Sequence, residues 1–171
     1  MSTSTFKTID FDNLPQYQKR SYLPENIDFT DVDQVKVQYQ TLLDKPVNSA
    51  ADLEAWIMHR SELETALDQA GSILYIRMTC QTDDAGRAEK YTHFIEKIAP
   101  AVKPLDFALN QKFLEYVEQY PLDTARYEIY TREIKTDVEL FQEENVPLET
   151  KVQLLSQEYQ TICGAMTVEF D

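Results

Sequence analysis

The chain has 171 residues, long enough for one domain with a substantial core and short for two. Its 30 acidic residues against 16 basic ones give a formal net charge of −14. A field of that sign repels phosphate backbones and anionic lipids, so we expect neither nucleic acid nor a membrane surface as a partner. Only 3 glycines occur, which disfavours the turn-rich sandwiches, barrels and Rossmann-type sheets and favours long helices.

The compartment is expected to be the cytoplasm. The first residues, MSTSTFKTIDF, have neither the basic start nor the apolar stretch of a secretory signal. No run of about 18 apolar residues is present for a membrane-spanning helix. The two cysteines, Cys80 and Cys163, are too few and too far apart for a disulfide framework. These features together predict a cytoplasmic, reduced protein.

An extended arm is expected over residues 1–28, which contain two prolines and show no clear period. Its scattered aromatic side chains suggest that the arm packs on a body. A first helix is predicted over residues 30–44, where Thr30 and Asp33 form a T-x-x-D cap and Pro46 provides the stop.

The clearest helical pattern spans residues 49–81, capped by Ser49 with Asp52. Arg60 interrupts its apolar face, and we expect a partly buried ion pair with an acid on a facing helix. The alternative is a carboxylate-binding or interface arginine. Gly71 lies inside the pattern and is expected to let a neighbouring helix approach closely. The apolar positions recur every three or four residues at Leu53, Trp56, Leu63, Leu67, Ala70, Leu74 and Met78.

A third helical pattern, antiparallel to the second, is predicted over residues 84–120, with the acidic pair at 83–84 capping it. Pro100 and Pro104 fall inside this pattern. Because each lacks a backbone N–H and clashes one turn back, a kink or short break is expected at 100–104. The apolar face consists of Tyr91, Phe94, Ile98, Val102, Leu105, Leu109, Phe113 and Val117.

Two further helices are predicted over residues 123–143 and 148–162, the latter stopped by Gly164. The face of the first of these would carry Ile129 or Tyr130, Ile134, Val138 and Phe141. Glu143 and Glu144 would end this helix, an unfavourable place for negative charge unless a basic side chain lies nearby.

The C-terminal residues change period and predict a strand over residues 165–171, in which Met166, Val168 and Phe170 alternate with polar residues. A lone strand leaves its backbone groups without partners. The fold class predicted is therefore all-α, a bundle of about five helices in long antiparallel hairpins over residues 29–164, with an extended N-terminal arm and one C-terminal strand.

No residue of this chain is predicted to be catalytic, cofactor-binding or metal-ligating. His59 and His93 are the only histidines, and neither stands in an H-E-x-x-H or Glu-x-x-His motif. Both are expected to be solvated or capping. Cys80 and Cys163 form no C-x-x-C pair and are expected to be small core residues.

Several stretches together resemble the N-terminal part of bacterial oligoendopeptidase F-type zinc metallopeptidases, of the thimet-oligopeptidase-like superfamily. The most specific succession is a V-P-L-E-T turn, a Q-E-Y helix and then G-A-M-T-V leading into a strand. The resemblance spans about residues 50–171. It is carried by RSELETAL (60–67), YIRMTCQTDD (75–84), YTHFIEKIAPAVKPLDFALNQKFLE (91–115) and LFQEENVPLETKVQLLSQEYQTICGAMTVEF (140–170).

The resemblance implies a mostly helical protein that is much longer than this chain. Its zinc would be held by an H-E-x-x-H helix and a later Glu, with the Glu of the motif as general base, all downstream of the matched region. None of these residues is present here, so no catalytic or zinc role transfers to any position, and the chain alone is expected to be inactive.

In such proteins the matched segment builds one wall of a deep channel that admits short peptides, and its final strand continues into a hairpin that leads to the catalytic region. The partners implied are the catalytic lobe of the same peptidase and, in the whole enzyme, short peptides. Self-association through the exposed lobe-facing surface is expected. The alternative hypothesis is a free-standing acidic helical protein-interaction module.

Overall fold

The structure is a computed structural model that describes residues 20–167. Over this range the regular structure is entirely helical, without a strand, which confirms the all-α prediction. None of the helices in this range is both long and apolar enough to cross a membrane. In chain order the elements are α1 (Val32–Asp44), α2 (Ala50–Cys80), α3 (Ala85–His93), the π-helical turn η2 (Phe94–Ile98), α4 (Ala99–Gln119), α5 (Thr124–Leu140), the 3-10 turn η3 (Glu143–Asn145) and α6 (Val146–Gly164).

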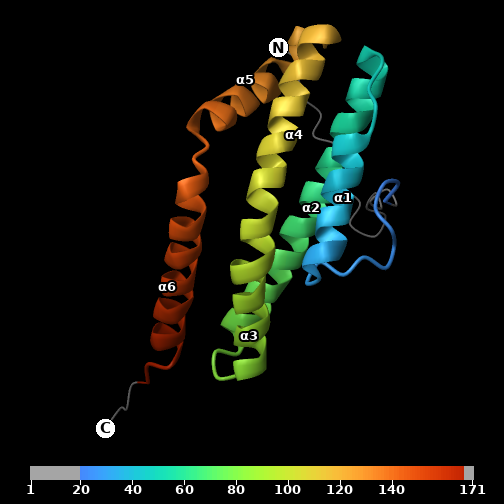
Figure 1. Ribbon diagram of the computed structural model, residues 1–171. Helices are drawn as coiled ribbons and strands as arrows, with labels where there is room; N and C mark the ends of the chain where they lie inside the picture. The colour runs from blue at the N-terminus through green and yellow to red at the C-terminus, as the bar shows by residue number, and fades with distance from the viewer. Residues whose placement is uncertain (1–19, 168–171) are drawn as a thin grey trace, which may run out of the picture.

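The helices α1, α2 and α4 form the body of the molecule, and α5 and α6 form an outer arm (Figure 1). From the end of α2 the chain reverses through α3 and returns along α4. At the far end of α4 it turns through α5, and α6 then runs back beside α4, η2 and α2. The outer arm of α5 and α6 therefore lies on the side of α4 away from α1.

The core lies where α1, α2 and α4 meet. Trp56 is its centre: the side chain is completely buried, its Nε1 donates a hydrogen bond of 3.0 Å to the carbonyl oxygen of Leu42, and Tyr116 meets it edge-on. The largest side chains with almost no exposed surface are Trp56, Tyr39, Phe113, Leu42, Leu53, Leu63, Met78, Ile98, Leu109 and Val35.

Three helix starts show how far capping patterns predict the structure. Ser49 caps α2 and Asp84 caps α3, as predicted. The predicted cap of α1 is wrong by one residue, because Asp31 rather than Thr30 accepts hydrogen bonds from the N–H groups two and three residues on. Thr30 instead donates its hydroxyl to Asp28 in the preceding turn.

The break predicted at 100–104 lies earlier, in the π-helical turn before Pro100. There the N–H of Ala99 bonds to the carbonyl oxygen of Phe94, five residues back. Because Pro100 has no N–H and its ring crowds the preceding turn, widening that turn relieves the clash before the proline is reached. Pro104 lies inside α4 without ending the helix.

The connection between α5 and α6 corrects two predictions. α5 ends at Leu140, so Glu143 and Glu144 do not end a helix. They form the 3-10 turn directly before α6, where the positive end of the helix dipole favours negative charge. α6 begins at Val146, earlier than predicted, because Pro147 fits the first turn of a helix, where no N–H donor is needed.

The predicted strand at 165–171 is not seen in its described part, because Ala165 forms a turn and Met166 and Thr167 have no regular structure. Residues 168–171 of that prediction lie outside the described range. Gly164, predicted to stop the last helix, is its final residue.

Of the arm predicted at 1–28, residues 20–28 are described and run without regular structure along α2. Glu62 of α2 holds this segment, because its carboxylate accepts hydrogen bonds of 2.9 Å from the N–H groups of Ser21, Tyr22 and Leu23. Burial alone would raise the pKa of Glu62, but these hydrogen bonds outweigh it and lower that pKa.

Candidate functional site

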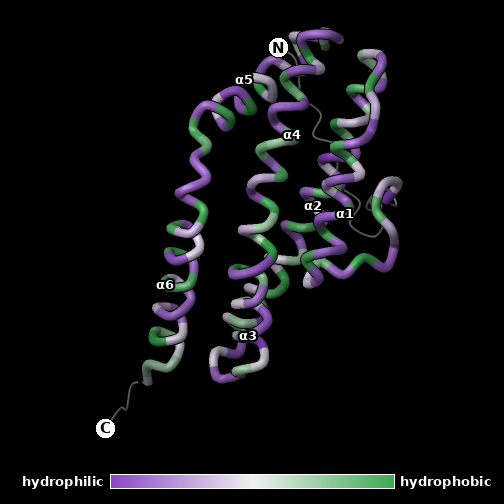
Figure 2. Tube along the Cα trace, in the orientation of Figure 1, coloured by the Kyte–Doolittle hydropathy of each residue, from purple (hydrophilic) through white to green (hydrophobic). Residues whose placement is uncertain are grey.

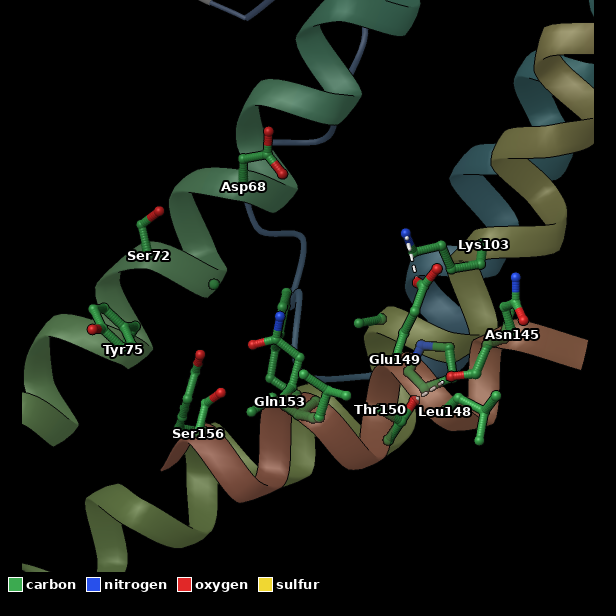
Figure 3. Close-up of a pocket in the computed structure, with 18 of the residues that line it drawn as sticks. Asp68, Ser72, Tyr75, Lys103, Asn145, Leu148, Glu149, Thr150, Gln153 and Ser156 are labelled. Carbon is green, nitrogen blue, oxygen red and sulfur yellow. Dashed lines mark hydrogen bonds and ion pairs between the residues drawn. The ribbon is translucent and has the colours of Figure 1, made fainter. Parts of the chain in front are cut away.

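A groove of about 1060 Å³ opens between α2, the α3–η2–α4 segment and α6 (Figure 3). Its volume is slightly larger than the usual range of small-ligand pockets. The residues that line it come from three walls and are Asp68, Gly71, Ser72, Tyr75, Tyr91, Phe94, Ile95, Ala99, Pro100, Lys103, Asn145, Val146, Leu148, Glu149, Thr150, Val152, Gln153, Ser156 and Gln160.

The floor of the groove is apolar and depends on Gly71. A Cβ atom at this position would lie 2.8 Å from the ring of Phe94, so the missing side chain lets the ring approach α2. This confirms the close approach predicted for Gly71. Tyr75 and Tyr91 continue the floor, with ring centroids 5.5 Å apart. Together these groups give a surface on which an apolar side chain would pack.

The α6 wall carries several polar side chains beside the apolar Leu148 and Val152. Gln153 and Ser156 project from α6 into the space between it and α2 (Figure 3). Gln160 donates from Nε2 to the hydroxyl of Tyr75 at 3.0 Å, while its buried Oε1 has no hydrogen-bond partner among the described residues. Amide and hydroxyl groups spaced along one wall are suited to hydrogen bonding with the backbone of an extended chain.

One end of the groove is charged. Lys103 of α4 forms an ion pair of 3.1 Å with Glu149 of α6, and Asp68 faces this pair from α2 (Figure 3). Both members of the pair are about half exposed, so the pair contributes little to stability. Charges of both signs are thus available to a ligand at this end.

A buried polar cluster lies on α2 and α4 near this charged end. Arg60, only 6% exposed, donates from Nε to Glu64 at 2.5 Å and from Nη2 to Oδ1 of Asn110 at 2.6 Å. The predicted buried ion pair exists, but its acid is one turn along the same helix, and the facing helix supplies the neutral Asn110. Burial disfavours the charge of Arg60, yet Glu64 outweighs this, and the pKa of Arg60 is raised.

Asp106 completes this cluster with an unusual carboxyl group. Its Oδ1 and the Nη1 of Arg60 are buried without a hydrogen-bond partner in the described part of the chain. Burial raises the pKa of Asp106 from 3.8 to about 6, and the negative charge of Glu64 adds to the effect. The carboxyl therefore changes charge just below neutral pH.

Neither histidine lies in the groove. His59 is half-buried rather than solvated: it stacks on Tyr22 with centroids 5.0 Å apart, and its Nδ1 lies 2.7 Å from Nζ of Lys45. Burial and the charge of Lys45 lower its pKa. His93 is exposed, and its Nε2 hydrogen-bonds at 2.9 Å to the carbonyl oxygen of Thr30, tying α3 to the turn before α1.

Cys80 and Cys163 are both exposed, so the prediction that they are core residues is wrong. Cys80 is the last residue of α2, and Cys163 lies on α6, which has no buried residue. Within residues 20–167, no three His, Cys, Asp or Glu side chains converge in a way that suits a metal ion. The described residues therefore do not fit a zinc site, and no step of zinc chemistry is assigned to them.

The groove could not be identified from the sequence, because the polar residues of its α6 wall are ordinary surface residues. Gln153, Ser156 and Gln160 recur at helical spacing, which is a signal of a shared face. That spacing does not indicate whether the face looks at solvent or at α2.

Residues 25–141 match the family model described as the peptidase M3 N-terminal domain. The match includes α1 to α5 and therefore two walls of the groove, whereas α6 follows it. No curated protein and no solved structure matches the chain. Because the matched span is more than half of the sequence and agrees with the resemblance found in its motifs, the chain belongs to the peptidase M3 N-terminal domain family and is an N-terminal portion of a thimet-oligopeptidase-like metallopeptidase.

Proposed function

We propose that this chain forms a non-catalytic wall of the substrate channel of an oligoendopeptidase F-type zinc peptidase that hydrolyses short peptides. The observation that carries the proposal is the groove of about 1060 Å³ in a domain of this family. The groove holds and orients a peptide, and a catalytic lobe of the same peptidase cleaves it. Zinc bound in that lobe would activate the attacking water.

The lining of the groove suits an extended peptide. Apolar side chains of the peptide pack on the floor at Phe94, while its backbone amides bond to Gln153 and Ser156, which project into the groove. At the charged end, Lys103 would attract a peptide carboxylate, and Asp68 a peptide ammonium. The residues of this chain thus bind and orient the substrate and exclude water from it.

A surface that packs on a catalytic lobe is apolar, so the domain without that lobe would associate with itself.

The cytoplasm remains our expected location.

Peptide binding to the groove is tested by titrating a fluorescent octapeptide of alternating apolar and polar residues into the 171-residue protein. We expect saturable binding that Ser72→Trp weakens by about fivefold or more, since the indole occupies part of the groove that the peptide would fill. Thr65→Trp, at an exposed position on α2 outside the groove lining, is the control and should bind normally. Equal affinity of both variants would show that the peptide does not occupy the groove.

The non-catalytic role is tested with the same protein after dialysis against zinc. The domain should retain no stoichiometric metal and should leave a quenched fluorescent peptide uncleaved. Turnover that a chelator abolishes would place catalysis in this chain and contradict the proposal.

A free-standing acidic helical interaction module is the second candidate, favoured by the exposed apolar side chains of α6. This function requires no peptide in the groove. The titration decides between the two, because a module would show no saturable peptide binding that depends on position 72.

A further inference from the structure

α6 carries an apolar stripe whose side chains are largely exposed, and whose first two members, Leu148 and Val152, also border the groove. Its members recur in alternating steps of four and three, and each is between 55% and 74% exposed. Figure 2 shows hydrophobic residues recurring along the length of α6 at the outer edge of the molecule. The stripe consists of Leu148, Val152, Leu155, Tyr159, Ile162 and Met166, of which Met166 lies two residues beyond the end of α6.

From Leu148 to Ile162 the spacing averages 3.5 residues, which is compatible with the repeat by which two helices wind around each other in a left-handed coiled coil. A stripe with this spacing along α6 suits another helix as its occupant. In heptad terms, Val152 and Tyr159 take position a, and Leu148 and Leu155 take position d.

The charged side chains beside the stripe indicate which helix can pair with it. α6 carries only Glu149, Lys151 and Glu158 as charged side chains, although the chain as a whole is strongly acidic. Glu149 pairs with Lys103 at the groove. Lys151 and Glu158 are one heptad apart and both take position g, on the same edge of the stripe.

We infer that the α6 stripe pairs antiparallel with the α6 stripe of a second copy of this chain. In antiparallel coils, g positions face g positions. A two-fold axis between Gln153 and Leu154 places Lys151 against Glu158 of the second copy, twice by symmetry. The same register stacks Val152 on Leu155 and Leu148 on Tyr159 of that copy.

Other pairings of the two helices lack this complementarity. A parallel pair brings Lys151 opposite Ser156, and Glu158 opposite Cys163, so no ion pair forms. An antiparallel pair shifted by one heptad brings Glu158 against its own copy, which is repulsive. The proposed register is therefore the one that the charges of α6 favour.

This inference rests on the proposed function, which expects the domain to self-associate through its lobe-facing surface. It adds that the surface is the α6 stripe and gives the register of the two helices. Its test involves neither peptide nor catalytic lobe, so its failure and that of the channel proposal are distinguishable. Sedimentation equilibrium of the 171-residue protein should show a monomer–dimer equilibrium. Leu155→Glu should raise the dissociation constant by about 100-fold or more, because two carboxylates enter the apolar seam.

Ile129→Glu is the matched control, since Ile129 is 60% exposed on α5 and lies away from the stripe. It should leave the dimer unchanged, and circular dichroism should show both variants equally helical. A protein that is monomeric at all concentrations, or a dimer that survives Leu155→Glu, would overturn the inference.

A charge swap tests the register. Lys151→Glu or Glu158→Lys alone should weaken the dimer by about tenfold, because each places like charges opposite one another twice. The double variant carrying both substitutions should recover the original affinity. A dimer that is insensitive to both single substitutions would contradict the antiparallel register.

Discussion

α2 and α6 are both long helices of similar apolar content, but their surroundings differ. α2 buries Leu53, Trp56 and Leu63 completely, whereas α6 has no buried residue. α2 packs against both α1 and α4, so its apolar face meets two helices. α6 touches its neighbours along one side only. Apolar composition and period thus predict a helix, but burial depends on how many neighbours reach it.

The contacts that hold the two helices differ in kind as well. α2 is held by apolar packing and by a buried arginine. α6 is held by polar contacts, such as Gln157 of α6 donating from Nε2 to the carbonyl oxygen of Ala88 at 3.2 Å and to the hydroxyl of Thr92 at 3.0 Å. Such contacts exchange readily with water, so α6 is the element we expect to open first.

Truncating a core side chain of α2 should have the largest effect on the free energy of unfolding. Trp56→Ala removes a completely buried indole and its hydrogen bond to Leu42, and should lower the free energy of unfolding by about 3–5 kcal/mol. Leu155→Ala on α6 should lower it by less than about 0.5 kcal/mol, because that side chain is exposed. Urea denaturation followed by circular dichroism, at concentrations where the protein is monomeric, measures both. Similar losses would mean that α6 is as well packed as α2.

Removing the buried charge of α2 is the next largest change. Arg60→Met leaves Glu64 and Asn110 without their partner and should lower the free energy of unfolding by about 2–3 kcal/mol. The effect is moderated because Glu64 is one-third exposed and keeps part of its hydration. Arg132→Met, at an exposed position of α5, is the control and should change stability by less than about 0.5 kcal/mol. Equal stability of both variants would show that the Arg60 network is unimportant.

Asp106 of α4, in the same buried cluster as Arg60, should make the stability of the fold depend on pH. Its pKa in the fold is raised to about 6 from 3.8, so the folded state binds a proton more tightly than the unfolded state does. The stability from this group is complete below about pH 4 and is lost as pH rises through 6. Asp106→Asn should therefore be more stable than the native protein by about 1–2 kcal/mol at pH 7 and equally stable near pH 4.

Urea denaturation at several pH values between 4 and 7.5 measures this difference. Taking the difference between the two proteins cancels the contribution of Glu62, whose lowered pKa acts in the opposite direction. A difference that stays constant with pH would show that Asp106 has an ordinary pKa in the fold.

Local rules predicted the helices and most of their starts from the sequence. Ser49 and Asp84 cap their helices because a side-chain acceptor followed by free N–H groups is a local arrangement. The close approach at Gly71 was also predictable. A glycine inside a helix costs stability, so it is expected where another side chain must come close to the helix backbone. The prolines predicted an irregular turn, but its position depends on how the preceding turn widens.

The groove and the stripe were not predictable in the same way. Cys163 was expected to be a small core residue at the end of its helix, yet it is exposed because α6 has neighbours on one side only. The acid that pairs with Arg60 was sought on a facing helix, although Glu64 lies one turn away. In each case the outcome depends on the distance between helices, which periodicity does not determine.

The smallest expected effect concerns the ion pair that links α6 to the body. Lys103 and Glu149 lie 3.1 Å apart with both side chains about half exposed, so the gain in attraction is nearly offset by hydration and side-chain entropy. A double-mutant cycle of Lys103→Met and Glu149→Gln should give a coupling energy below about 0.5 kcal/mol, and less in 1 M salt. A coupling above about 1 kcal/mol that resists salt would mean that the charged end is drier than its exposure indicates. The position of α6 would then depend on this pair rather than on the many weak polar contacts along its length.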